Sequence, residues 1–361
     1  MKTVRILTLV IFASLLVSCV VSKTDPDYLN NISISASVKK MDIVAKSHTK
    51  AASSADPFEV ISSNHKLEAK LLFSFDEDSY LQGTDNNIAE FPLFGQCHIP
   101  CHTSAVFASA DFEFVKYEED NLTYPSRDED ALRDVYCVGL YPKDNWIISV
   151  DAETAVQTAS HPIDGSSDIM FADIIKGSWS SPFSKPLNFK HLQTWIKVLV
   201  SANTNDAAEK WGNVTKITVG SASGVNIALG SIPAATSATT CTSNVTYAAD
   251  TVNITVFEND GGMPLSITTQ EIGSVFVVSP ARNSNNDQAV KFYMKVHTET
   301  FPEGKDVKVL LYDLNNQLIQ AKNETIGKLF VLNLNFTNLD VIEGVCTLNY
   351  WNDQDDDLYL Q

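Results

Sequence analysis

Short runs of residues with a period of two dominate this 361-residue sequence and constrain its fold more than any other feature. Side chains alternate between the two faces of a β-strand, so such a period marks a strand with one buried and one solvated face. Polar connections rich in Asn, Asp, Gly and Pro separate the runs, which favours an all-β protein built as β-sandwiches. The expected strands are 67–75, 104–117, 135–141, 146–150, 195–201, 214–219, 246–256, 275–278, 290–297, 307–312 and 329–334.

The first 19 residues are typical of an export signal of the lipoprotein kind. Lys2 and Arg5 precede an apolar stretch, 6–17, that is too short to span a bilayer, and small residues lead into Cys19. An acylated cysteine anchors a chain to a membrane, because each buried CH₂ contributes about 0.8 kcal/mol. We therefore expect residues 1–18 to be removed and Cys19 to be lipidated. The alternative is an ordinary signal peptide in which the cysteine is incidental.

A separate strand is expected directly after the anchor. Its apolar residues alternate with serines over seven positions, which predicts a strand with one buried and one wet face. These apolar residues are Ile32, Ile34, Ala36 and Val38. The small, polar and basic stretch 45–57 follows, and we expect it to be exposed and open to proteolysis.

The length after the signal is enough for two domains. Residues 202–212 are a candidate interdomain stretch, which puts the expected boundary near residue 205. The predicted organisation is a signal peptide (1–18), a lipid-anchored segment with a removable strand (19–50), an N-terminal sandwich (51–205) and a C-terminal sandwich (206–361).

The chain is acidic, with a net charge of −18 that becomes −20 once the two basic residues of the signal are removed. Acidity of this size argues against nucleic acid and against anionic lipid surfaces as partners. It suits a solvated extracellular surface. Residues 19–50 are instead slightly basic, so they would bind the acidic body favourably.

Five cysteines follow Cys19, too few for a disulfide-dense scaffold, and their pairing stays open. They are Cys97, Cys101, Cys137, Cys241 and Cys346. The segment 97–102, Cys-His-Ile-Pro-Cys-His, could hold a metal or, with a lengthened spacing, a haem. Adjacent Cys and His side chains of an extended chain point to opposite sides, so a disulfide or free thiols explain the segment more simply. We expect neither a metal nor a cofactor.

Other patterns carry no convincing chemistry. The acidic run 353–357 lacks the Gly and the distal bidentate acid of a calcium loop, so a solvated tail is expected. The segment 220–224 has Ala where a nucleophile elbow has Ser. His191 is expected to be a structural histidine bonded to the backbone. The prediction is a protein that is not an enzyme.

The order of several short motifs resembles the fimbrillin family, the type V pilins of Bacteroidales. After the lipoprotein signal, the alternating strand and the basic linker come four further segments. They are Gly-Leu-Tyr-Pro at 139–142, Asp-Ile-Met-Phe-Ala at 168–172, Leu-Asn-Phe-Lys-His-Leu at 187–192 and the strand from Cys346 to Trp351.

The resemblance implies two transthyretin-like β-sandwich domains in tandem and export to the outer-membrane surface. It also implies that a trypsin-like surface protease removes the first strand, and that other fimbrial subunits then supply a replacement strand. Lys50 and Ala51 flank the expected cut, with Lys46 as the alternative, whereas family members often have Arg there. Ile32, Ile34, Ala36 and Val38 are expected to fill the groove beforehand.

The tail of this chain is a poor apolar donor strand. Its candidate pocket residues are Trp351, Leu358, Tyr359 and Leu360. A tip or accessory subunit, a stalk subunit and an anchor all remain open, as does the host or bacterial receptor.

The competing hypothesis is a static surface lipoprotein that binds glycans or peptides. Three tryptophans, Trp146, Trp179 and Trp211, could stack on sugars if they were exposed, although core packing is the simpler use of each. A third hypothesis is a protein that holds a metal or haem at 97–102.

Overall fold

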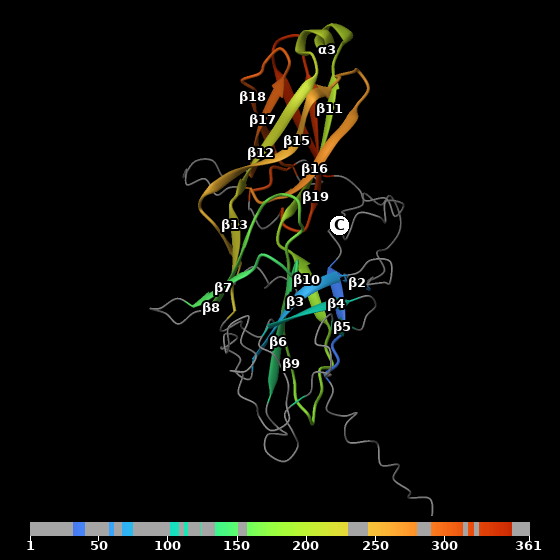
Figure 1. The fold of residues 1–361 in the computed structure, drawn as a ribbon. Coiled ribbons are helices and arrows are strands. Elements are labelled where there is room, and N and C mark those ends of the chain that lie inside the picture. The colour runs from blue at the N-terminus through green and yellow to red at the C-terminus, as the bar shows by residue number, and fades with distance from the viewer. Residues whose placement is uncertain are drawn as a thin grey trace, which may run out of the picture.

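The computed structural model describes residues 32–39, 58–60, 67–74, 102–107, 112–114, 124, 134–150, 157–229, 245–279, 290–312, 317–320 and 325–348. Strands make up most of these residues, which confirms the all-β prediction. The strands form two lobes, and Figure 1 shows the second lobe above the first. Within the described residues, no helix is long and apolar enough to cross a bilayer.

The first lobe is built from an eight-stranded sheet and a four-stranded sheet. In spatial order, the eight-stranded sheet contains β2 (Phe58–Val60), β1 (Ala36–Lys39), β10 (Leu187–His191), β9 (Met170–Gly177), β6 (Val135–Tyr141), β3 (Leu67–Ser74), β4 (His102–Phe107) and β5 (Phe112–Phe114). The four-stranded sheet contains β14 (Val245–Tyr247), β13 (Gly224–Ala228), β8 (Gln157–Pro162) and β7 (Ile147–Val150).

Each face of the eight-stranded sheet lies on its own apolar core. On one face, side chains such as Leu140 and Phe171 pack against Val225 and Ile227 of the smaller sheet. On the other face, the sheet curls over itself. The ring centroids of Phe107 on β4 and Phe189 on β10 are 6.2 Å apart, although three strands separate β4 from β10. The second core is therefore the inside of this curl.

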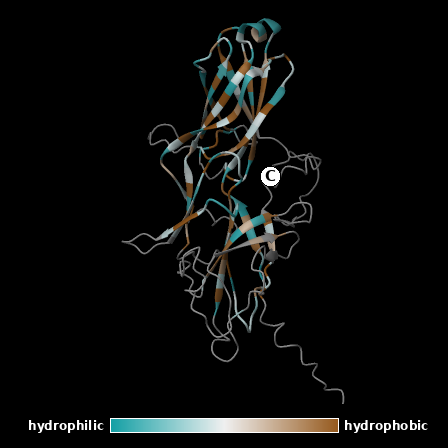
Figure 2. Ribbon diagram, viewed as in Figure 1, coloured by the Kyte–Doolittle hydropathy of each residue, from teal (hydrophilic) through white to brown (hydrophobic). Residues whose placement is uncertain are grey.

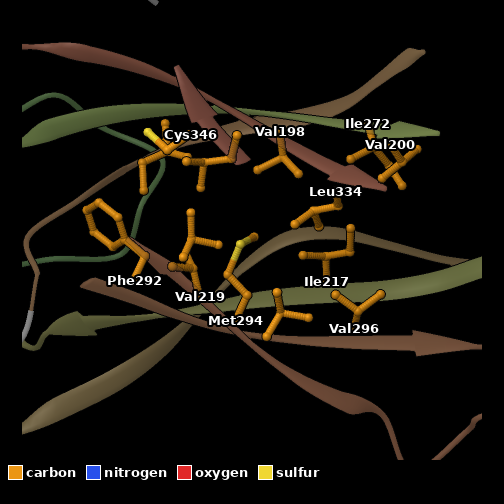
Figure 3. Close-up of a cluster of buried hydrophobic side chains, with 14 of the residues drawn as sticks. Val198, Val200, Ile217, Val219, Ile272, Phe292, Met294, Val296, Leu334 and Cys346 are labelled. Carbon is orange, nitrogen blue, oxygen red and sulfur yellow. The ribbon is translucent and has the colours of Figure 1, made fainter. Parts of the chain in front are cut away.

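The second lobe is a sandwich of two four-stranded sheets. One contains β16 (Gln270–Val277), β11 (Thr194–Ala202), β19 (Leu329–Phe336) and β20 (Ile342–Leu348). The other contains β15 (Thr251–Met263), β12 (Val214–Ala222), β17 (Lys291–Thr298) and β18 (Lys305–Leu310). Figure 3 shows side chains of the two sheets meeting, with Val198 and Cys346 on one side and Phe292 and Met294 on the other. Brown and teal alternate along several of these strands in Figure 2, as the two-residue period predicts.

The stretch 202–212, expected to connect two domains, lies inside the second lobe. It contains α3 (Asn205–Trp211), which begins after Thr204, whose Oγ1 accepts a hydrogen bond from Ala207 N at 3.1 Å. The helix ends at Gly212, whose φ of 69° suits glycine. Trp211 is fully buried and its Nε1 donates to Thr337 O at 2.8 Å. Because Trp211 anchors the helix in the core, this polar stretch is not a linker.

The chain also crosses between the lobes more than once. β11 already belongs to the second lobe, so the expected boundary near 205 comes later than the point at which the chain enters that lobe. β12 then leads through Ser223 into β13, which pairs with β8 of the first lobe. The strands β13 and β14 therefore complete the first sandwich from the second half of the sequence. The two lobes share chain segments, which a single boundary cannot describe.

Most expected strands are present with small shifts at their ends. The run 104–117 is instead two strands, β4 and β5, paired antiparallel with Ala105 opposite Phe114. The expected run 246–256 is also two strands, β14 and β15, which belong to different sheets. The expected strands do not include β2, β8, β9, β10 or β13. Apart from the eight-residue β9, these unexpected strands are short.

Candidate functional site

The segment 32–39 lies inside the first lobe, and its two faces differ sharply in exposure. Ile32, Ile34 and Ala36 are only 5%, 1% and 2% exposed, and they belong to the core inside the curled sheet. Val38 is partly buried against the same core, whereas Ser33 is exposed. The segment thus contributes one continuous row of side chains to a core whose other members come from residue 67 onward.

Backbone pairing holds this segment between two neighbours. β1 runs parallel to β10, with Ala36 opposite Leu187 and Val38 opposite Phe189. Leu187 N donates to Ser35 O at 2.8 Å. On its other side β1 pairs antiparallel with β2. Paired residues on adjacent strands point to the same face, so Ala36 and Val38 lie on the core side beside Leu187 and Phe189.

A side-chain hydrogen bond adds to this pairing on the outer face. Ser37 Oγ donates to Asn188 Oδ1 at 2.7 Å, and both residues are half-buried. The two residues are register partners, so the bond joins side chains that lie directly opposite each other. Unlike the backbone pairing of β1, this hydrogen bond requires particular side chains at positions 37 and 188.

The position of the Phe189 side chain in the core depends on a glycine on the strand β6. Phe189 is fully buried, and its ring lies where a side chain at position 139 would be. A Cβ placed on Gly139 would be 2.6 Å from Phe189 Cζ and 2.9 Å from Cε1. Gly139 on β6 therefore makes room for the ring beside which Val38 packs.

Two side-chain contacts with carboxylates connect β10, the strand on which β1 pairs, to β9 and the residues just before it. Lys190 Nζ donates to Asp173 Oδ2 in a largely buried contact. His191 Nδ1 lies 2.5 Å from Asp168 Oδ2, and both residues are buried. His191 was expected to be a structural histidine bonded to the backbone, and in the structure its Nδ1 pairs with the Asp168 carboxylate. Antiparallel pairing explains this, because His191 is opposite Met170, close to Asp168. The buried ammonium group of Lys190 requires such a partner to be tolerated.

The covalent connection between the segment and the rest of the lobe runs through residues 40–57. This connection leads from Lys39, the last residue of β1, to Phe58, the first of β2. Within the described residues, β1 is the only strand that pairs with β2. A cut between the two would leave β1 attached to the lobe by non-covalent contacts alone. The expected cleavage residues Lys46, Lys50 and Ala51 lie outside the described residues, so their role stays a prediction.

Several other predicted residues also lie outside the described part of the chain. They are Cys19, Cys97, Cys101, Cys241, Trp351, Leu358, Tyr359 and Leu360. Lipidation, disulfide pairing of those cysteines and the role of the C-terminal strand therefore stay predictions. Among the described residues no group of three or more His, Cys, Asp and Glu side chains could hold a metal ion.

Two cysteines are described, and both are free and buried. Cys137 belongs to the core inside the curled sheet and Cys346 to the core of the second lobe. Burial raises the pKa of the Cys137 thiol well above its ordinary value. It also raises the pKa of the Cys346 thiol to about 12. Each lobe thus contains one described cysteine whose thiol is buried and has a raised pKa.

We expect neither thiol to react with a maleimide near neutral pH while the chain is folded, because thiolate is scarce and access is closed. In guanidinium both should react fully. Pulsed labelling followed by peptide mass mapping resolves the two cysteines from the others. Rapid modification of either thiol without denaturant would contradict its burial.

The tryptophans considered for sugar stacking serve the cores. Trp146 is 6% exposed, and its Nε1 donates to Pro142 O at 2.7 Å. Trp211 is fully buried within the second lobe. Trp179 is half-buried and packs against the core inside the curled sheet. The burial of Trp146 and Trp211 removes two of the three candidate stacking residues.

Sequence reasoning found the apolar row of the segment but missed the residues that receive it. Asn188 and Phe189 were noted only as part of a motif, and Gly139 only as part of another. The period-two alternation Leu187, Phe189, His191 was the available signal for β10. Nothing in the sequence pairs β10 with β1, because the register partners Ser37 and Asn188 are 151 positions apart in the chain.

In comparisons with known proteins, this chain matches several solved structures at low sequence identity. No family model matches the sequence, and no curated protein matches it. A candidate cell adhesion protein of Bacteroides uniformis is 13% identical, with a TM-score of 0.44, over 89% of this chain and 99% of that one. One of Bacteroides ovatus is 14% identical, with a TM-score of 0.44, over 90% and 99%. A candidate polysaccharide-binding protein of Bacteroides thetaiotaomicron is 7% identical, with a TM-score of 0.42, over 90% and 99%. Likeness at this level carries no argument about function.

Proposed function

We propose that this chain is a subunit of a cell-surface fimbria that contributes to adhesion. In this proposal it is exported as a lipoprotein through Cys19 and anchored in the outer membrane. A trypsin-like surface protease cuts at Lys50, and another fimbrial subunit replaces the freed strand with one of its own. The observation that carries the proposal is the segment 32–38, which fills a core and whose connection to β2 in the sequence contains Lys46 and Lys50.

The energetics of the segment suit a strand that is stable in place yet replaceable. Burying an isoleucine side chain contributes about 1.5–3 kcal/mol, so Ile32 and Ile34 together hold the strand firmly. Its departure would bare an apolar groove and the backbone edge of β10 (187–191). An exposed sheet edge beside apolar pockets readily accepts an extended segment of another chain. The contacts of Lys190 and His191 support β10 from the β9 side, so this edge would keep its shape.

The position of this subunit within a fibre depends on whether its C-terminal tail can serve as a donor strand for another subunit. The acidic tail offers few apolar residues for a partner's groove, which favours a tip or accessory subunit over a stalk subunit. Its receptor would be a host or bacterial surface molecule. The alternative is a static surface lipoprotein, in which the segment 32–39 never leaves.

Limited trypsin digestion of residues 20–361, followed by an unheated detergent gel, tests the proposal. We expect cleavage after Lys46 or Lys50 before the strands are cut, and a Lys46→Gln, Lys50→Gln double variant should lose cleavage at these two positions. A ladder of detergent-resistant multimers after cleavage would indicate a stalk subunit, and cleavage without a ladder a tip or accessory subunit. Resistance of the native linker would contradict the proposal and favour the static lipoprotein.

A further inference from the structure

We propose that Asn188 is a specificity-determining residue that recognises a hydroxyl group on the outer face of any strand entering the groove. This inference rests on the proposed function, because it describes the partner of the same site. The favoured partner is an extended segment that runs parallel to β10 and carries Ser or Thr opposite Asn188.

The resident segment shows how the recognition works. The bond from Leu187 N to Ser35 O uses backbone atoms, so almost any sequence could form it. The bond from Ser37 Oγ to Asn188 Oδ1, at 2.7 Å, requires a side-chain donor. Ser37 and Asn188 are half-buried, so water competes less for this hydrogen bond than it would at an exposed site. A strand without a hydroxyl group at this position would therefore leave Asn188 Oδ1 without this hydrogen-bond donor.

The hydroxyl alone does not fix the register. Ser33, Ser35 and Ser37 are spaced by two, so a slip of two residues would still place a serine opposite Asn188. Such a slip would bring Ile34 to the place of Ala36, which is 2% exposed within the core beside Leu187. Overpacking of this kind destabilises a close-packed core. The small residue therefore selects the register, and Asn188 selects the chemistry of the outer face.

The two requirements together define the sequence of a fitting strand. Large apolar residues stand at the first and third positions, a small residue at the fifth, a hydroxyl residue at the sixth and an apolar residue at the seventh. Residues 351–360 contain no Ser or Thr and do not match this pattern. The pattern therefore favours a donor strand other than residues 351–360, one that carries Ser or Thr at the sixth position.

Peptide exchange into the trypsin-cut full chain tests the role of Asn188. A fluorescent synthetic peptide with the sequence of residues 30–40 replaces the native fragment in mild guanidinium, and its dissociation is followed after the denaturant is removed. The peptides are the native sequence, Ser37→Ala, and Ser33→Ala as the exposed matched control. The proteins are the native chain, Asn188→Ala, and Asn188→Asp, which keeps an acceptor oxygen.

We expect the Ser37→Ala peptide to leave the native chain about five-fold faster than the native peptide, from the usual net worth of one hydrogen bond. The Ser33→Ala peptide should behave like the native one. Asn188→Ala should hold the native and Ser37→Ala peptides equally, and Asn188→Asp should restore the preference. Equal dissociation from the native chain, or a preference that persists in Asn188→Ala, would overturn the role of Asn188. If no peptide enters the native chain at all, the exchangeable strand itself is refuted, and this inference with it.

Discussion

Replacing Ile34 by Ala is expected to lower the free energy of unfolding of the first lobe by about 2–5 kcal/mol. Ile34 is 1% exposed and lies in the core inside the curled sheet. Removing its side chain beyond Cβ leaves a cavity that the surrounding strands can fill only in part. The second lobe has a separate core, to which residues 32–39 contribute nothing, so its stability should change little.

The buried thiols report on each lobe separately in this experiment. Pulsed maleimide labelling over a guanidinium series measures opening of the first lobe at Cys137 and of the second at Cys346. The Ile34→Ala variant should shift the Cys137 transition to lower denaturant. Ser33→Ala, on the exposed face of the same segment, is the matched control and should shift neither transition. An unchanged Cys137 transition in Ile34→Ala would show that the segment does not support this core.

Gly139→Ala should destabilise the same lobe by about 1–3 kcal/mol, the usual cost of an added methyl group in a packed core. The new Cβ would meet the Phe189 ring at 2.6 Å, so the ring must move. Phe189 is fully buried and pairs with Val38, hence its displacement would also loosen the resident strand. We expect faster release of the trypsin-cut fragment as well as lower stability.

Gly220→Ala is the matched control, because Gly220 also lies within a strand. Within the described part of the chain, and apart from its sequence neighbours, the only heavy atom within 4 Å of its added Cβ is Tyr293 O at 3.6 Å, an ordinary contact. With room for the methyl group, alanine should be neutral or slightly stabilising there. Gly220 lies on β12 of the second lobe, so the Cys346 transition measures the stability of Gly220→Ala, whereas the Cys137 transition measures that of Gly139→Ala. The rate of fragment release is measured for both variants. Equal behaviour of Gly139→Ala and Gly220→Ala would contradict the close approach of Phe189 to β6.

The sequence predicted the fold class because its strands alternate clearly, as in β11 and β19. Local pattern was less informative where tertiary contacts override it. Lys190 and His191 are buried in β10 because carboxylates on or near β9 pair with them, and these polar residues make the strand look less apolar in the sequence. The helix at 205–211 resembles a polar linker, since only Ala207 and Trp211 reach the core.

The candidate site was half predictable for the same reason. The apolar residues from Ile32 to Val38 are close together in the sequence, so their period of two predicts a buried face of a strand. The residues that receive it are distant in the chain, and single-sequence patterns carry no register between distant strands. Asn188 and Gly139 became recognisable only when the structure placed one opposite Ser37 and the other beneath Phe189.

Fragment exchange between cut chains tests the central claim most directly. Trypsin-cut chain is mixed with trypsin-cut chain labelled uniformly with ¹⁵N, and native mass spectrometry follows the complexes in mild guanidinium. If the segment 32–39 is replaceable, species that combine a light fragment with a heavy body will appear, and the intact chain will give none. Retention of the original pairs up to the denaturant at which Cys137 becomes reactive would mean that the strand is a permanent part of the lobe.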